Sequence, residues 1–348
     1  MLKIVTVVGA RPQFIKAGPV SRAISERIGL YEVLVHTGQH FDDAMSAVFF
    51  RELELPEPRY NLGIASLAQG AMTGRMIEAV EEVLVKEKPG MLLVYGDTNS
   101  TIAGALAAAK LHIPVGHIEA GLRSFNRRMP EEINRVVTDH LATIQFCPTR
   151  AAVDNLANEG ITRDVHHTGD VMYDATLFAI ERNGQDDSAL SSLGLEPNGY
   201  DVCTIHRAEN TDDLRQLRSV VDFLRAQAAA RPMIMPLHPR TRAAIERAGL
   251  DLSPIRSIDP LGYFELHRLL AGAKTVLTDS GGLQKEAYFH GKPCVTLRDE
   301  TEWVETIDHG WNRLWQASPY VTPRRSIEDY GQGKAAEKIV DLLVDFAG

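Results

Sequence analysis

The stretch from His117 to Arg135 holds the densest group of charged side chains in the sequence. It contains three carboxylates and four arginines, with few apolar residues between them. Charged groups crowded in this way are costly to bury unless they bind a ligand or move protons, so we predict a binding or catalytic segment. Other polar clusters follow apolar runs, which predicts that polar groups converge where strands end: Tyr95-Gly-Asp97, His206-Arg-Ala-Glu-Asn210 and Thr278-Asp-Ser-Gly-Gly282.

The elements that must position these groups alternate between short β-branched runs and longer helical patterns, which is typical of a parallel α/β fold. Residues 183–199 are rich in Gly, Ser, Asp and Asn and indicate a linker between two doubly wound domains. Such domains bind ligands in the cleft beyond the carboxyl ends of their strands. We expect strands at 3–8, 32–36, 91–95, 115–118, 143–147, 165–167, 201–205, 233–237, 255–258, 275–277 and 294–297, and helices at 17–28, 42–53, 69–87, 99–111, 131–142, 149–158, 211–230, 240–248, 262–272, 281–290 and 334–346.

Three carboxylates are candidates for proton transfer. Asp97 and Glu119 stand at predicted strand ends, and Glu131 stands at the start of a predicted helix. Asp97 could instead cap a helix, and Glu131 could simply favour a helix N-terminus. Like charges brought together at the mouth of one sheet would raise their pKa values into a range useful for catalysis. His206 ends another predicted strand and could shuttle protons near neutral pH.

Two strand-to-helix turns are candidates for binding phosphate, because free N–H groups and the helix dipole point outward there. The first is Gly9-Ala-Arg-Pro-Gln-Phe-Ile-Lys16, where Arg11 and Lys16 add positive charge. The second is the turn at Ser280, Gly281 and Gly282, which suits a diphosphate, and Glu286 beyond it could accept ribose hydroxyls. Neither turn carries a Gly-x-Gly-x-x-Gly or Walker motif, so a nicotinamide dinucleotide is disfavoured.

Composition excludes several classes of protein. A net charge of -9 without a long basic tract disfavours nucleic acid and anionic membranes as partners. Three scattered cysteines suggest neither a disulfide framework nor a thiolate metal site, and no histidine spacing argues for a metal. The chain also lacks an apolar run long enough for a membrane span and begins with a strand-like pattern. We therefore expect a cytoplasmic protein.

The ordered set of motifs resembles the non-hydrolysing UDP-N-acetylglucosamine 2-epimerases. That resemblance implies an α/β fold of two Rossmann-like domains of the glycosyltransferase B type with a deep cleft between them. It places one domain at 1–182, with a C-terminal helix at 334–347 packing back on it, and a UDP-binding domain at 183–333. The matching stretches span nearly the whole chain: Gly9–Lys16, Thr37–His40, Gly96–Thr101, His117–Arg123, Pro130–Arg135, His206–Asn210, Thr278–Glu286 and Leu297–Glu305.

The resemblance also implies a mechanism. UDP leaves from C1 while C2 loses its proton, a 2-acetamidoglycal forms, and UDP adds back after C2 is reprotonated from the opposite face. No cofactor is needed, the substrate is a UDP-sugar, and the family tends to be dimeric. The acid/base candidates are Asp97, Glu119, Glu131 and His206; the groups expected to contact substrate are Arg11, Lys16, Arg135, Ser280, Gly281, Gly282 and Glu286. Which carboxylate takes the proton and which returns it is left open.

One departure from the family pattern concerns the sugar. UDP-N-acetylglucosamine enzymes usually read Thr-Glu-Arg-Pro-Glu where this chain reads Thr301-Glu-Trp-Val-Glu305. Together with the Ser124-Phe-Asn-Arg-Arg-Met-Pro-Glu-Glu132 segment, this looks more like the branch that epimerises UDP-2,3-diacetamido-2,3-dideoxy-glucuronate. Arg127 or Arg128 could pair with the extra carboxylate of that sugar, or both could be solvated loop charges. A changed residue at Ala208 also leaves the family's activator site in doubt.

The leading prediction is an isomerase that interconverts UDP-N-acetylglucosamine-type and UDP-N-acetylmannosamine-type sugars for surface polysaccharide synthesis. The alternative substrate is the diacetamido-glucuronate. Three remoter alternatives are a hydrolysing epimerase, which would release free sugar and UDP, a glycosyltransferase, which would need an acceptor, and a UDP-sugar sensor. A sensor has no need of Asp97, Glu119 and His206 together.

Overall fold

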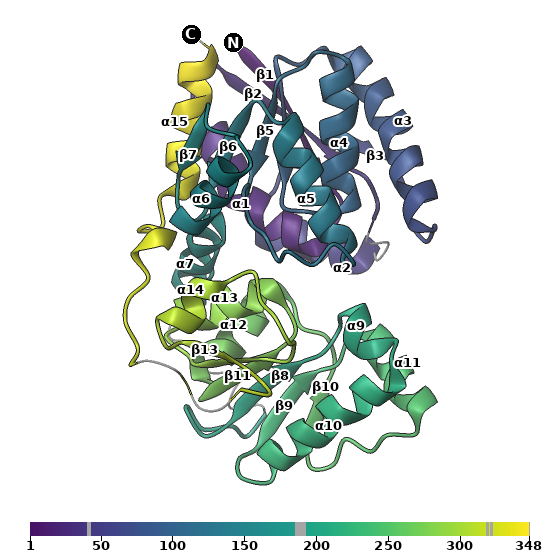
Figure 1. Cartoon of the computed structure of the whole chain (residues 1–348), viewed down its shortest axis with the longest axis vertical. Helices are drawn as coiled ribbons and strands as arrows, with labels where there is room; N and C mark the ends of the chain where they lie inside the picture. The colour runs from purple at the N-terminus through teal and green to yellow at the C-terminus, as the bar shows by residue number, and fades with distance from the viewer. Residues whose placement is uncertain (40–42, 185–192, 318–319, 321–322, 348) are drawn as a thin grey trace. The chain divides into compact units, whose positions relative to one another are not determined.

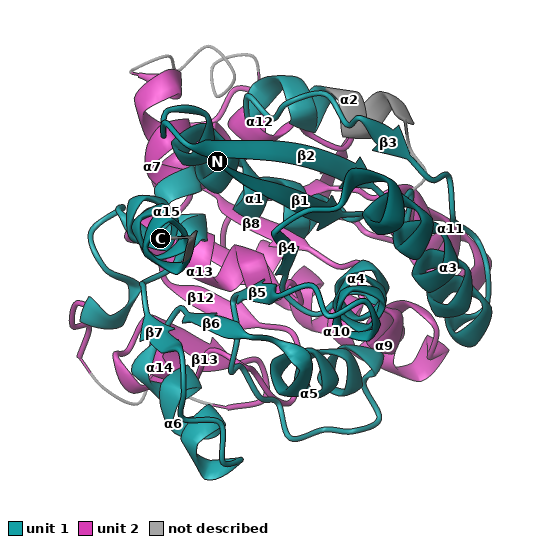
Figure 2. Ribbon diagram, turned by 90° about the horizontal axis from the view of Figure 1, so that it is seen from above, with its two compact units in different colours: residues 1–175, 328–348 teal, residues 176–327 magenta. Residues whose placement is uncertain are grey.

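The protein is described from a computed structural model, which covers residues 1–39, 43–184, 193–317, 320 and 323–347. The chain divides into two compact units (Figure 2): unit 1 comprises residues 1–175 and 328–348, and unit 2 comprises residues 176–327. The division falls inside helix α7 (Val171–Asn183), just ahead of the expected linker. Residues 185–192 of that linker, and His40 of one matched motif, lie outside the described residues.

Unit 1 is built on a parallel sheet of seven strands in the order β3-β2-β1-β4-β5-β6-β7. The central strand β1 (Leu2–Val8) pairs on one side with β2 and on the other with β4, and most of its residues are buried because helices cover both faces of the sheet. The other strands are β2 (Leu30–His36), β3 (Tyr60–Asn61), β4 (Met91–Tyr95), β5 (Val115–Ile118), β6 (Ile144–Cys147) and β7 (Val165–His167).

The helices of unit 1 follow its strands in turn, as Figure 1 shows. The last of them, α15 (Ala335–Ala347), packs against α1, and the Asp174 carboxylate accepts hydrogen bonds from its first two backbone N–H groups at 3.2 and 2.8 Å. The remaining helices are α1 (Arg11–Ser25), α2 (Asp43–Glu52), α3 (Gln69–Glu87), α4 (Asn99–Lys110), α5 (Pro130–Leu141) and α6 (Arg150–Asn158), with a short 3-10 turn at Glu328–Tyr330.

Unit 2 repeats this plan with a parallel sheet of six strands in the order β10-β9-β8-β11-β12-β13. Separate apolar clusters line its two faces; Val202 belongs to one and Cys203 to the other, since successive strand residues point to opposite sides. Its elements are β8 (Asp201–Thr204), α9 (Ala208–Thr211), α10 (Leu214–Ala228), β9 (Met233–Pro236), α11 (Pro239–Ala248), β10 (Arg256–Ile258), α12 (Tyr263–Gly272), β11 (Thr275–Thr278), α13 (Gly281–Phe289), β12 (Cys294–Thr296), α14 (Val304–Asp308) and β13 (Asn312–Leu314).

The predicted α/β fold class is confirmed, since both units hold parallel sheets with helices between the strands. Strand order reverses between β1 and β4 in unit 1 and between β8 and β11 in unit 2. Loops that leave these neighbouring strands in opposite directions open a crevice at the carboxyl edge, where such sheets bind ligands. The segments that follow β1, β4, β8 and β11 carry most of the predicted site residues, while Glu119 follows β5 and Glu131 and Arg135 lie on α5.

Some expected elements differ from the structure. Helix α1 begins at Arg11 rather than residue 17, because Pro12 occupies its first turn, where a missing N–H costs nothing. The expected helix 211–230 is shorter, as α10 from Leu214 to Ala228, and the separate short helix α9 ends at Thr211. The Asp213 side chain caps α10 by accepting from the N–H groups of Arg215 and Gln216. The short edge strands β3 and β13, and the helices α7 and α14, had not been predicted.

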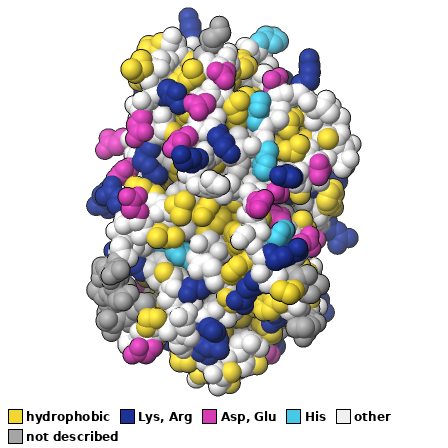
Figure 3. Space-filling model, turned by 90° about the vertical axis from the view of Figure 1, so that its left-hand side faces the viewer, with side chains coloured by type: hydrophobic (Ala, Val, Ile, Leu, Met, Phe, Trp, Pro, Cys, Tyr) yellow, Lys and Arg dark blue, Asp and Glu magenta, His cyan; other side chains and the backbone are white. Residues whose placement is uncertain are grey.

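Surface charge is mixed over the face drawn in Figure 3, where basic and acidic side chains are interspersed among apolar ones. Within the described part of the chain, no helix combines the length and the apolar character needed to cross a membrane.

Candidate active site

A buried ion pair joins helix α1 to the end of strand β5. The Lys16 Nζ lies 2.6 Å from Oε1 of Glu119, and both side chains are less than 10% exposed. Glu119 follows β5 directly and has φ of 69°, a left-handed conformation that is uncommon for a residue with a side chain. Such backbone strain is found mainly where the surroundings impose it, often at functional sites.

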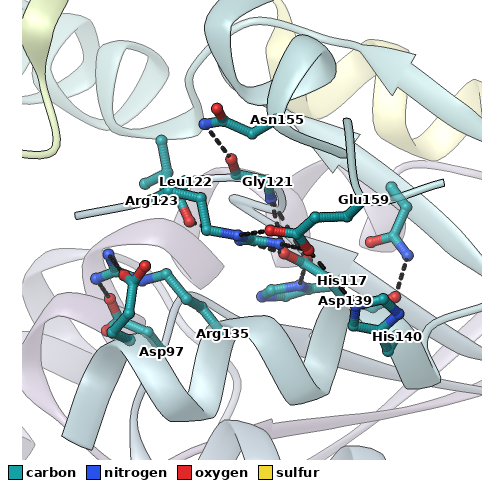
Figure 4. Close-up of polar contacts among 12 residues, drawn as sticks. Asp97, His117, Gly121, Leu122, Arg123, Arg135, Asp139, His140, Asn155 and Glu159 are labelled. Atoms are coloured by element: carbon teal, nitrogen blue, oxygen red, sulfur yellow. Dashed lines mark hydrogen bonds and ion pairs between the residues drawn. The ribbon is translucent and has the colours of Figure 1, made fainter. Parts of the chain in front are cut away.

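Asp97 lies beside this pair, at the end of the neighbouring strand β4. Gly96, which precedes it, has φ of 59°, and a Cβ there would come within 3.0 Å of the Lys16 Nζ and 3.7 Å of the Glu119 Oε1. A side chain at position 96 would therefore crowd the Lys16 ammonium and would be strained by its left-handed backbone conformation, which glycine adopts freely. The Asp97 carboxylate is paired with the Arg135 guanidinium of α5 (Figure 4).

The charges around Asp97 set its proton affinity. Burial alone would raise the pKa of the Asp97 carboxyl, and the negative charge of Glu119 acts in the same direction. The positive charges of Arg135 and Lys16 outweigh both effects and hold the pKa of Asp97 below its ordinary value. Without ligand, Asp97 is therefore an ionised carboxylate that can accept a proton but has none to give.

Glu132, rather than Glu131, is the buried carboxylate at the start of α5. Its oxygens accept hydrogen bonds from the backbone N–H groups of Ser124 and Phe125, both at 2.9 Å, and one lies 2.9 Å from Nη1 of Arg135. Glu132 thus ties the 124–129 loop to the arginine that holds Asp97. Glu131, the predicted catalytic residue, is partly exposed and makes no hydrogen bond or ion pair with the described residues.

A second charged network lies behind these groups, and none of its members was assigned a role from the sequence. His117 of β5 places Nδ1 2.7 Å from Oδ1 of Asp139 and Nε2 2.7 Å from the carbonyl oxygen of Gly96. The other Asp139 oxygen lies 2.7 Å from Nη1 of Arg123, whose remaining nitrogens donate to Glu159 at 2.7 and 2.8 Å. Figure 4 shows these side chains converging on Asp139.

In unit 2, the central carboxylate is Asp279, which follows β11 and is fully buried. Its oxygens accept from the backbone N–H groups of His206 and Arg207, both at 3.0 Å, and from the Asn210 side chain at 3.1 Å. The His206 Nδ1 lies 2.9 Å from Oδ1 of Asp279, while the His206 side chain is 44% exposed. Although burial opposes ionisation, the charge of His206 and these donors lower the pKa of Asp279 to about 2.

The turn at Ser280, Gly281 and Gly282 opens helix α13, as predicted. The Ser280 hydroxyl caps the helix by accepting from the N–H of Leu283 at 3.4 Å. Gly281 stands in a confined place, since a Cβ there would lie 3.3 Å from the indole nitrogen of Trp303 and 3.7 Å from a terminal nitrogen of Arg207. A phosphate group at this helix N-terminus would meet backbone N–H groups, the helix dipole and these donors together.

Glu286, the predicted ribose contact, is also buried in unit 2. Its Oε1 lies 3.5 Å from Nε2 of His267, whose Nδ1 lies 2.8 Å from Nε2 of His290. Trp303, which replaces the arginine usual in UDP-N-acetylglucosamine enzymes, covers Lys285, with Nζ 3.7 Å from the ring centroid. An arginine in place of Trp303 would bring a second cation against the fully buried Lys285.

The structure therefore brings some predicted residues together within each unit. Lys16, Glu119, Asp97 and Arg135 form one cluster in unit 1. The Arg11 guanidinium lies 4.5 Å from the Phe49 ring centroid. His206, Ser280, Gly281 and Gly282 surround Asp279 in unit 2. Sequence reasoning missed the carboxylates that organise these turns, Glu132, Asp139 and Asp279, although two of them stand inside the quoted motifs.

Metal-ion chemistry and cysteine nucleophiles receive no support from the described residues. None of their His, Cys, Asp and Glu side chains gather in threes suited to hold a metal ion. Cys147, Cys203 and Cys294 are buried and free, and burial raises the pKa of each thiol far above the range in which it would be a nucleophile.

Two parallel α/β units with strand-end carboxylates in one and a glycine turn at a helix N-terminus in the other are typical of enzymes that bind nucleotides at the carboxyl ends of their strands. The family model described as UDP-N-acetylglucosamine 2-epimerase matches residues 22–344. The chain belongs to this family, and it is therefore an isomerase.

Individual relatives agree along the whole chain. The UDP-2,3-diacetamido-2,3-dideoxy-D-glucuronate 2-epimerase of Pseudomonas aeruginosa is 53% identical over 98% of this chain and 99% of its own. The UDP-N-acetylglucosamine 2-epimerase of Methanocaldococcus jannaschii is 40% identical over 98% and 99%. The structure of the M. jannaschii enzyme with UDP-GlcNAc and UDP superimposes with a TM-score of 0.92 at 38% identity, covering 99% of both chains. The Neisseria meningitidis enzyme bound to UDP-GlcNAc gives 0.89 at 29% identity, covering 99% and 100%.

Proposed function

We propose that this protein inverts C2 of a UDP-sugar by eliminating UDP and adding it back. The C2 proton is not next to a carbonyl, so its direct removal is unfavourable. Breaking the bond between C1 and the UDP oxygen while a base takes the C2 proton gives a 2-acetamidoglycal and UDP. Proton delivery to the opposite face of C2 and return of the UDP oxygen to C1 complete the epimerisation, with no net change in redox state.

The observation that carries this proposal is the cluster at the switch point of unit 1. Two carboxylates, Asp97 and Glu119, stand at neighbouring strand ends with one cation, Lys16, next to both. Proton removal from one face and delivery to the other require two separate proton carriers. Glu131 and His206 are further candidates for this exchange, and the arrangement leaves open which group takes the proton and which returns it.

UDP is proposed to bind unit 2. The helix N-terminus at Ser280, Gly281 and Gly282 would hold the diphosphate, and Glu286 would accept the ribose hydroxyls. The departing diphosphate gains negative charge during elimination, so N–H donors placed there stabilise the leaving group. Arg11, Lys16 and Arg135 of unit 1 are proposed to supply positive charge around the sugar and diphosphate.

The substrate that the chain favours is UDP-2,3-diacetamido-2,3-dideoxy-glucuronate. Support comes from the 53% identity to the P. aeruginosa enzyme of that name, and from Trp303, which stands where an arginine is usual. Arg127 and Arg128 are exposed on the loop that Glu132 ties to Arg135. A guanidinium on this loop can pair with the carboxylate of a uronate sugar in two parallel hydrogen bonds.

The test is a side-by-side assay of the two UDP-sugars in deuterated water. The uronate sugar is expected to gain deuterium at C2 at least tenfold faster than UDP-N-acetylglucosamine, as read by NMR. Replacing Arg127 or Arg128 with alanine should raise the KM for the uronate about tenfold and leave UDP-N-acetylglucosamine unaffected. Arg163→Ala, at another exposed arginine, is the matched control. Absence of exchange with either sugar would refute the epimerase proposal.

UDP-N-acetylglucosamine is the second candidate substrate. Its support is the superposition on the M. jannaschii and N. meningitidis enzymes, which were determined with that ligand. Faster exchange with this sugar, unaffected by Arg127→Ala and Arg128→Ala, would make it the substrate and leave the two arginines as solvated loop charges.

We also propose that the enzyme works as a cytoplasmic homodimer that supplies precursors for surface polysaccharide. The support is the family resemblance. Size-exclusion chromatography with light scattering measures the mass directly, and a value near twice 38.4 kDa is expected.

A further inference from the structure

The buried network around Asp139 surrounds the strained turn that carries Glu119. Asp139 binds the ring of His117, two residues before Glu119, and the backbone N–H of Gly121, two residues after it, at 3.2 Å. One carboxylate on α5 therefore holds both flanks of a residue whose φ is 69°. Gly121 has φ of 80°, and a Cβ there would come within 2.3 Å of the Ala152 carbonyl oxygen, so the close turn needs glycine.

The same histidine reaches the turn that carries Asp97. The His117 Nε2 lies 2.7 Å from the carbonyl oxygen of Gly96, and the N–H of Gly96 donates to the Ile118 carbonyl at 2.9 Å. The N–H and the carbonyl oxygen of Gly96 are therefore both hydrogen-bonded to residues of β5. A change at His117 would free one of them and let the Asp97 backbone rotate.

The partners of the two ring nitrogens bear on the protonation state of His117. A carbonyl oxygen only accepts, so Nε2 donates to Gly96. The Asp139 Oδ2 atom accepts from the Arg123 guanidinium and the Gly121 N–H, and Nδ1 faces the other oxygen, Oδ1. An ionised Asp139 leaves Nδ1 as the donor of that bond, and a ring that donates at both nitrogens is an imidazolium. Its positive charge and that of Arg123 balance the negative charges of Asp139 and Glu159, which allows all four to be held together with little solvent contact.

We propose that His117 is a positioning residue, held as an imidazolium between Asp139 and the Gly96 carbonyl, which fixes the turns of Asp97 and Glu119 relative to each other. The inference deepens the proposed function and assigns His117 no contact with substrate. Its position two residues before Glu119 and its full burial make it a fixed support rather than a proton carrier.

Two substitutions separate the two hydrogen bonds of His117. The amide nitrogen of asparagine can take the place of Nδ1, so His117→Asn keeps the bond to Asp139 and loses the bond to Gly96. The amide of glutamine reaches the place of Nε2, so His117→Gln keeps the bond to Gly96. We expect His117→Asn to lower kcat at least tenfold, with the Kd of UDP within threefold of wild type, and His117→Gln to retain more activity.

The control is Glu159→Gln, at the far end of the same network, where the side chain is 27% exposed. Its kcat is expected to stay within threefold of wild type even though its thermal stability falls. The proposal is overturned if His117→Asn leaves kcat unchanged, if UDP affinity falls in parallel with kcat, or if Glu159→Gln loses as much activity as His117→Asn.

An NMR measurement tests the inference without turnover. In wild-type protein labelled with ¹⁵N-histidine and bound to UDP, His117 should show protons on both ring nitrogens. In Asp139→Asn, whose amide can donate to Nδ1, only the Nε2 proton should remain. A ring with one proton in the wild type would overturn the proposal. Failure of wild-type enzyme to exchange C2 of either sugar would refute the epimerase proposal alone, because the ring measurement stands apart from activity.

Discussion

Each unit contains a histidine paired with a fully buried aspartate, and the two pairs differ in one respect. His117 and Asp139 are both 0% exposed, and both nitrogens of the ring are engaged. His206 pairs with Asp279 through Nδ1 alone, and its side chain is 44% exposed. The same two residue types thus form a pair enclosed by protein in unit 1 and a pair whose histidine is open to solvent in unit 2. The difference in exposure, rather than the pairing itself, is the basis for proposing different roles for the two histidines.

The two aspartates also make similar hydrogen bonds to the backbone. Asp139 holds the turn after β5 through Gly121, and Asp279 holds the turn after β8 through His206 and Arg207. In both cases a carboxylate from a distant part of the chain satisfies N–H groups at a strand end. Unit 1 uses the fixed turn to present charged side chains, whereas unit 2 presents a helix N-terminus. This difference predicts that some substitutions will lower kcat without changing the affinity for UDP, and that others will do the reverse.

The largest effect that follows is on turnover through unit 1. Asp97→Asn or Glu119→Gln should reduce kcat by about 100-fold or more, because each removes a proton-transfer group. The Kd of UDP should change little, since the nucleotide is proposed to bind unit 2. Steady-state kinetics and calorimetric titration with UDP measure the two quantities. Equal and undiminished activity in both variants would show that the roles are wrongly assigned.

Glu131→Gln sharpens that result, because Glu131 makes no hydrogen bond or ion pair with the described residues. The substitution therefore disturbs none of the described polar contacts, while Glu119→Gln also leaves the buried Lys16 without its carboxylate. A loss in Glu131→Gln as large as that in Asp97→Asn would assign Glu131 to proton transfer. Activity like that of wild type would assign it to the favourable charge at the N-terminus of α5.

The two histidines should respond in opposite ways to substitution. His206→Asn keeps a donor toward Asp279 and removes the exposed ring nitrogen, so kcat should fall about 100-fold with little change in stability. His117→Phe leaves Asp139 with one charged partner fewer and should lower the free energy of unfolding by about 3 kcal/mol. Urea titrations and kinetics on both proteins test the contrast. A stability loss in His206→Asn as large as in His117→Phe would remove the distinction between them.

A smaller effect concerns the nucleotide turn. Ser280→Trp should raise the Kd of UDP about 30-fold, equivalent to about 2 kcal/mol, because the large ring fills the space at the N-terminus of α13. Ser280→Ala is the matched control, since it removes only the cap and should cost about 1 kcal/mol of stability. Unchanged UDP affinity in Ser280→Trp would place the diphosphate elsewhere.

The fold and the strand-end positions of the site were predictable because they are local. Runs such as Met91–Tyr95 are short and apolar, and a polar group directly after such a run falls at the carboxyl edge of the sheet. Strands β3 and β13 escaped prediction because Tyr60–Asn61 and Asn312–Leu314 are short and contain polar residues instead of an apolar β-branched run. Helix α1 was predicted to start late because the whole of Gly9–Lys16 was interpreted as a strand-to-helix turn.

The partners of the site residues were not predictable, because they depend on tertiary contacts. Asp139 is 22 residues from His117, and Asp279 is 73 residues from His206. Neither separation leaves a pattern in one sequence. His117 and Arg123 were singled out only as members of a charged stretch. The signal that could have assigned them is their crowding, since so many charges close together require buried partners of opposite sign.

Acid sensitivity at Asp279 is a further prediction, with a smaller expected effect. The pKa of Asp279 is about 2 in the folded protein against an ordinary value of 3.8, which corresponds to about 2 kcal/mol of stability. A lowered pKa means that the folded state prefers the ionised form. This stability is therefore fully present above pH about 4 and is lost as the pH falls toward 2. All three tryptophans, Trp303, Trp311 and Trp315, lie in unit 2, so their fluorescence reports its unfolding.

Urea unfolding followed by this fluorescence at pH 6, 4 and 3 tests the effect. Asp279→Asn should be less stable than wild type by about 2 kcal/mol at pH 6, and the difference should shrink toward pH 3 as the wild-type carboxyl takes up its proton. Asp212→Asn provides the control, because the Asp212 carboxylate is 62% exposed in its pair with Arg240. That variant should lose far less stability at every pH. A difference in stability between wild type and Asp279→Asn that stays constant with pH would contradict this prediction. It would mean that the variant is less stable because its amide fits the hydrogen-bond geometry poorly, and not because the negative charge is missing.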